Sequence, residues 1–106
     1  MLKDLSYLIE EDLSNFYSSN VNTMKEMFSG CVNLKSINFN NFVTSLVEDM
    51  NLMFYNCNSL TTLDLSNFRT PKVTIMTSMF NSCTSLKSLD LSKFDTSNVG
   101  SLQKLL

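Results

Sequence analysis

The strongest constraint on this chain is an internal repeat with a period of 26 residues. Phe28, Phe54 and Phe80 are 26 residues apart, and further Leu, Phe, Val, Met and Cys residues recur in the same register. Repeats of this length stack so that each unit buries its apolar face against the next. The 106 residues therefore predict a single domain, 1–106, with units at about 8–33, 34–59, 60–85 and 86–106. Residues 1–7 are in phase with the end of a preceding unit.

Each unit contains two periodicities. Its first part reads Leu-x-x-Leu-x-Leu, as at Leu60, Leu63 and Leu65, and the final alternation is typical of a strand with one buried face. Its second part reads Val-x-x-Met-x-x-Met-Phe-x-x-Cys, a spacing that places the apolar residues on one stripe of a helix. Thr70 before Pro71 fits the start of a helix, and Thr44-Ser45 and Thr96-Ser97 occupy the same positions. We expect strands near 10–14, 36–40, 62–66 and 88–92, and helices near 19–30, 45–56, 71–82 and 97–106.

A strand and a helix in every unit predict an α/β leucine-rich-repeat solenoid, with a parallel sheet on one face and the helices on the other. The strings LDLSNFRTPKVTIMTSMFNSCTSLKS and LDLSKFDTSNV resemble the BspA-like leucine-rich repeats of bacterial and protist surface proteins. This resemblance implies a right-handed solenoid from a cell-surface or extracellular protein engaged in adhesion and protein recognition. The N-terminus lacks an export signal, so a cytoplasmic or assembly-bound location stays open.

Composition excludes several classes of function. The chain has no His and a net charge of −2, so it lacks the commonest general base and the basic excess that nucleic-acid binding needs. We expect no membrane insertion because no apolar run approaches the length of a span. No nucleophile–base pair or phosphate loop occurs, so we expect neither an enzyme nor a cofactor. Cys31, Cys57 and Cys83 are spaced for neither zinc nor a disulfide, which predicts buried free thiols.

The strand positions that alternate with the buried ones form the first candidate site. They should project into solvent on the concave face: Ser36, Asn38, Asn40, Thr62, Asp64, Ser66, Ser88, Asp90 and Ser92. The pattern is compatible with a polar surface that recognises a protein, or with a solvated sheet face. A weak cation site is a third interpretation, because the column Asp12, Asn38, Asp64 and Asp90 supplies oxygen ligands.

Apolar residues at unexpected places suggest two further contact surfaces. Leu52, Tyr55 and Ile75 replace polar residues of the other units and should point away from the core on the helix face. Leu102, Leu105 and Leu106 continue the buried series at the C-terminal end, which we expect further repeats, a partner chain or self-association to cover. Two functions remain: a protein-recognition module, or a structural component packed permanently in a larger assembly.

Overall fold

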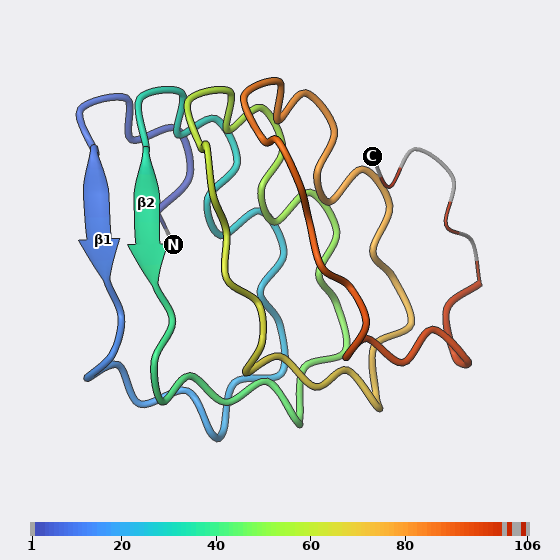
Figure 1. The fold of residues 1–106 in the computed structure, drawn as a ribbon. Helices are drawn as coiled ribbons and strands as arrows, with labels where there is room; N and C mark the ends of the chain where they lie inside the picture. The colour runs from blue at the N-terminus through green and yellow to red at the C-terminus, as the bar shows by residue number, and fades with distance from the viewer. Residues whose placement is uncertain (1, 101, 103–104, 106) are drawn as a thin grey trace.

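The chain winds through successive coils that lie side by side from the N-terminus to the C-terminus (Figure 1). This arrangement comes from a computed structural model, which describes residues 2–100, 102 and 105. Strands β1 (Glu10–Asp12) and β2 (Ser36–Asn38) form a two-stranded parallel sheet. Glu10 pairs with Ser36 and Asp12 pairs with Asn38. Paired residues are thus 26 positions apart, which is the period of the sequence repeat.

The predicted helices are wrong, because the described residues contain no helix. The segment around 24–31 is a series of tight turns, in which the N–H of Met27 bonds the carbonyl of Met24 at 3.2 Å and that of Cys31 bonds Phe28 at 3.1 Å. Left-handed backbone recurs at the same place in successive units, with φ of 59° at Glu26, 59° at Leu52 and 57° at Ser78. This conformation ends an α-helix rather than continuing it.

Hydrogen bonds between coils explain why turns replace the helix. The N–H of Met24 bonds Asp49 of the next coil at 2.9 Å, and the N–H of Phe28 bonds Met53 at 2.8 Å. An α-helix would keep these donors within itself. Local preference is also weak, because the chain has no Ala and contains 16 Ser, 9 Thr and 13 Asn, which favour turns over helix interiors.

The predicted sheet is only partly formed. Within the described residues, the strands are β1 and β2 alone, and residues 62–66 and 88–92 run alongside them without regular pairing (Figure 1). None of the backbone hydrogen bonds found among described residues joins 36–40 to 62–66. The α/β leucine-rich-repeat solenoid of four strand-helix units is therefore not the fold of this chain.

The core is built from aromatic rings that stack from coil to coil. Phe54 lies between Phe28 and Phe80, with ring centroids 5.7 and 5.5 Å apart and nearly parallel planes. A second stack joins Phe68 to Phe42 at 5.9 Å and to Phe94 at 6.2 Å. Most residues that the sequence placed on the helical stripe are buried here as well, among them Met24, Met27, Phe28 and Cys31. Turns and a helix thus bury the same side chains, because both return the chain to one side every three or four residues.

Buried hydroxyl groups, which the sequence analysis interpreted as helix caps, tie neighbouring coils together. Thr70 is 1% exposed; its Oγ1 accepts the N–H of Asp95 at 2.8 Å and donates to the Asp95 carbonyl at 3.1 Å. Thr44 makes the same pair of bonds to Arg69, at 2.9 and 2.6 Å. Each hydroxyl satisfies a donor and an acceptor that would otherwise lack a partner.

A membrane-spanning helix is absent from the described part of the chain, where no helix of the necessary length and apolar character occurs.

Candidate functional site: the strand face

The strand face consists of β1, β2 and the extended segments 62–66 and 88–92. All nine residues that the sequence proposed for the concave face lie on it or directly beside it, and each of them is exposed in the structure. They come from three successive coils and are brought onto one face by the repeat: Ser36, Asn38, Asn40, Thr62, Asp64, Ser66, Ser88, Asp90 and Ser92. The structure therefore assembles the predicted surface, although the sheet beneath it is incomplete.

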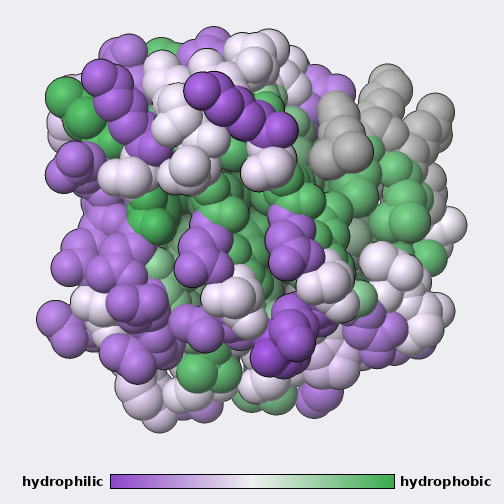
Figure 2. Space-filling model, viewed as in Figure 1, coloured by the Kyte–Doolittle hydropathy of each residue, from purple (hydrophilic) through white to green (hydrophobic). Residues whose placement is uncertain are grey.

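Two adjoining grooves cross the strand face where the sheet is open. The first has a volume of about 230 Å³ and is lined by Ile37, Asn38, Phe39, Asn40, Asp64, Ser66 and Asn67. The second has a volume of about 270 Å³ and is lined by Ser36, Ile37, Thr62, Leu63, Asp64, Ser88 and Asp90. Ile37 and Asp64 line both. In Figure 2 polar side chains on this face stand apart, and apolar surface shows between them. The face is thus amphipathic rather than uniformly polar.

The column of Asp and Asn side chains stabilises the turn that follows each extended segment. The backbone N–H of Ser66 donates to Oδ1 of Asp64 at 2.9 Å, and that of Ser92 donates to Oδ1 of Asp90 at 2.9 Å. Asp12 and Asn38 make the same bond to Ser14 and Asn40, each at 2.9 Å. This is the usual bond of an Asx-turn. Its recurrence explains why Asn can replace Asp at one position of the column.

These bonds also keep the carboxyl groups ionised. The side chain and then the backbone N–H of Ser66 hold the pKa of Asp64 below its usual range. Ser14 lowers the pKa of Asp12 in the same way. Ser92 lowers the pKa of Asp90, and the charge of Lys93 adds a smaller effect. The described residues contain no group of three or more acidic or sulfur side chains that could hold a metal ion. The cation interpretation of the column therefore gains no support.

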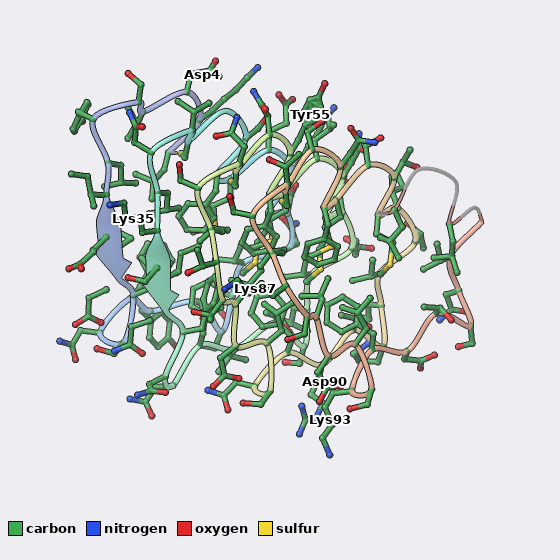
Figure 3. All side chains as sticks on the ribbon, turned by 45° about the horizontal axis from the view of Figure 1, so that its top comes forward. Asp4, Lys35, Tyr55, Lys87, Asp90 and Lys93 are labelled. Carbon is green, nitrogen blue, oxygen red and sulfur yellow. The ribbon has the colours of Figure 1, made fainter. Side chains whose placement is uncertain are left out.

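The predicted helix face lies on turns instead of a helix. Ile75 is 44% exposed, whereas Leu52 and Tyr55 are half-buried. The N–H of Leu52 bonds the carbonyl of Thr77 in the next coil at 3.1 Å. Tyr55 lies at the rim of the coils (Figure 3). Of these three residues, only Ile75 has an exposed apolar side chain, so the three do not form one continuous exposed apolar surface.

At the C-terminal end, apolar side chains are less covered than their equivalents in earlier coils. Phe94 and Leu86 are half-buried, whereas Phe68 and Leu60 are fully buried. Among the predicted contact residues, Leu102 is 47% exposed and Leu105 is half-buried, while Leu106 lies outside the described residues. A pocket of about 340 Å³ opens here, lined by Phe80, Ser82, Cys83, Thr84, Leu86, Lys87, Ser88 and Leu89.

The cysteines are free thiols, as the sequence predicted; Cys31 and Cys57 are buried, whereas Cys83 is only half-buried. The Sγ of Cys57 donates to the Phe28 carbonyl at 3.1 Å, and the Sγ of Cys83 donates to the Phe54 carbonyl at 3.0 Å. Burial raises the pKa of both groups, that of Cys83 to about 11. Such thiols act as packing groups with a weak donor, not as nucleophiles.

The apolar floor of the grooves is formed by side chains that the repeat places at inward positions. Ile37 is 9% exposed and belongs to the core, and Leu63 is half-buried and packs against it, yet both line the second groove. The sequence predicts their inward direction but not that part of each is accessible from the strand face. Lys35 and Lys87 lie on the strand-face side of two equivalent coils (Figure 3), 52 residues apart, and neither lines the first or the second groove.

Comparison with known proteins corrects the expected family. A family model described as "Mycoplasma protein of unknown function, DUF285" matches residues 1–106. The matched family is thus not the BspA-like leucine-rich repeats that the sequence strings resemble, and that assignment is wrong. No curated protein and no solved structure gives a significant match.

Proposed function

We propose that this chain, which belongs to the DUF285 family of Mycoplasma proteins of unknown function, is a non-catalytic module that binds another protein through its strand face. The observation that carries the proposal is the assembly of nine exposed polar residues on one face, eight of which line two grooves with an apolar floor. Protein-binding surfaces combine an apolar centre with polar groups that fix orientation. A location at the cell surface stays a prediction, and the proposal does not depend on it.

The packing beneath the strand face supports this role, because buried side chains hold the extended segments in place. Phe39 and Leu65, on the inner side of the same extended segments, are 4% and 3% exposed. Phe39 makes T-shaped contacts with Phe28, Phe54 and Phe68, with ring centroids 6.1, 6.1 and 5.0 Å apart. A surface anchored in this way loses little conformational entropy when it binds a partner.

Site-specific photo-crosslinking tests the proposal. A photoreactive side chain at Thr62, which lines the second groove, should give a protein adduct in the cells that produce the chain. The same side chain at Ser45, which is exposed outside the strand face, is the matched control. Excess unlabelled chain should suppress the adduct, while excess Thr62→Trp variant should not. Equal adducts at both positions, or none at Thr62, would contradict the proposal.

The half-buried C-terminal coil favours a second candidate function, a structural component whose end packs against a neighbour. Burying one Leu side chain contributes about 1.5–3 kcal/mol, and several apolar residues are half-buried at this end. We expect the chain to self-associate in sedimentation experiments and Leu105→Lys to reduce that association. A wild-type chain that stays monomeric at high concentration would exclude self-association as the way this end is covered.

A further inference from the structure

The second groove of the strand face has the chemistry to recognise one kind of side chain. Three exposed hydroxyl-bearing residues, one from each coil, lie along it: Ser36, Thr62 and Ser88. Ile37 and Leu63 supply an apolar floor, and Asp64 and Asp90 supply two carboxylates. A groove that combines an apolar floor with negative charge complements a long aliphatic side chain that ends in a cation.

The two carboxylates are held in place but not neutralised. In each, Oδ1 accepts the backbone N–H of the residue two positions later, Ser66 or Ser92. Among the described residues, no ion pair reaches either carboxylate; the one salt bridge found there joins Lys3 to Glu26 at 2.7 Å. Lys93 is the cation whose charge acts on Asp90, and no comparable effect acts on Asp64. The groove therefore keeps acceptor capacity and negative charge.

The backbone beside the groove also has unused bonding capacity. Within the described chain, residues 62–64 make no backbone hydrogen bond to either neighbouring coil. Thr62 and Asp64 are exposed, and Leu63 is half-buried. The second groove lies along this segment, which is flanked by residues 36–40 and 88–92 without regular pairing.

We propose, on the basis of the proposed function, that the groove binds an extended segment of the protein partner carrying a lysine or arginine next to apolar residues. The aliphatic stem lies on Ile37 and Leu63, and the cationic head lies between Asp64 and Asp90. Alternation along an extended segment directs every second side chain into the groove. The hydroxyl groups of Ser36, Thr62 and Ser88 are within the same groove to accept further hydrogen bonds.

Peptide binding to the intact chain tests this inference. The probes are short synthetic peptides of alternating leucine and lysine, leucine and glutamate, or leucine and serine, each with a fluorescent label for anisotropy. The leucine–lysine peptide should bind most tightly, and its binding should weaken at high salt. The double variant Asp64→Asn/Asp90→Asn should weaken it by roughly three- to tenfold, the effect of two partly exposed ion pairs.

The chain itself supplies the evidence that this variant keeps its fold. Asn38 occupies the same column and makes the same turn bond, to the N–H of Asn40 at 2.9 Å. The matched control is Asp12→Asn/Asp95→Asn, which removes the same charge from two carboxylates that also bond a backbone N–H at 2.9 Å but do not line the second groove. Because each double variant removes two carboxylates with lowered pKa values, the unfolding midpoints of both should fall slightly and by similar amounts at neutral pH.

Several results would overturn the inference. These are equal binding of the glutamate and lysine peptides, an unchanged affinity of Asp64→Asn/Asp90→Asn, or an equal loss in the control variant. Absence of binding by every peptide would overturn it as well. If the leucine–serine peptide bound as tightly as the leucine–lysine peptide, the recognition of a basic side chain would be refuted. The proposed function would remain, because the crosslinking experiment tests it separately.

Discussion

Truncation of one ring in the central aromatic stack, Phe54→Ala, should destabilise the chain strongly. Phe54 is 0% exposed and has a stacked ring on each side, with centroids 5.7 and 5.5 Å away, and a T-shaped contact with Phe39 at 6.1 Å. Burial on every side leaves the surrounding coils little freedom to collapse into the space that the ring leaves. We therefore expect a loss of about 4 kcal/mol, within the range of about 3–5 kcal/mol for Phe→Ala in a core.

The same substitution at Phe16 is the matched control. Phe16 is 37% exposed and has a single ring neighbour, Phe42, with centroids 6.2 Å apart. Partial burial of this kind predicts a loss of about 1–2 kcal/mol. The two variants remove the same atoms, so the difference between them measures the contribution of burial within the stack.

Equilibrium unfolding in urea measures both losses. With a slope of about 2 kcal/mol per molar urea, Phe54→Ala should lower the midpoint by about 2 M, and Phe16→Ala by less than about 1 M. A domain of this size has about 5–15 kcal/mol of stability, so Phe54→Ala should leave a folded but marginal protein. A loss below about 1 kcal/mol at Phe54, or equal losses at both positions, would refute the assignment of the stack as the main core.

Three further outcomes follow from the hydrogen bonds and thiols. Thr70→Val should cost about 1–3 kcal/mol in urea unfolding, because it leaves the N–H and C=O of Asp95 without their partner, whereas Thr70→Ser should retain most of the stability. The aspartates of the Asx-turns have lowered pKa values in the folded chain, so their contribution is complete above the unfolded-state pKa of about 4 and is lost as the pH falls through the folded-state values. The urea midpoint should drop on acidification below about pH 4, and less so when these residues are replaced together by Asn: Asp12, Asp64, Asp90 and Asp95. Iodoacetamide should modify Cys83, which is half-buried, faster than Cys57, which is fully buried, and both more slowly than an unfolded thiol; equal rates by mass spectrometry would contradict the packing of the last coil.

Much of the burial pattern could be predicted from the sequence alone. The 26-residue register identified the buried rings of Phe28 and Phe54, and the alternation along each strand segment identified the exposed side chains of Ser36 and Asp64. Both results depend only on which side of the chain a residue occupies. That side is set by residue spacing, which the sequence contains directly.

The hydrogen-bonding partners of the backbone were decided only by the tertiary structure. A helix and a series of turns both bury residues three and four apart, so the apolar spacing around Met24 and Met27 predicted a helix where none forms. The choice depends on the adjacent coil, whose Asp49 carbonyl accepts the N–H of Met24 at 2.9 Å. Likewise, residue spacing places Ile37 and Leu63 inward, but only the packing of the coils decides that part of each side chain lines the second groove. Spacing in a sequence determines which side chains turn inward, whereas the fit of one coil against the next determines which backbone groups bond and where the surface opens.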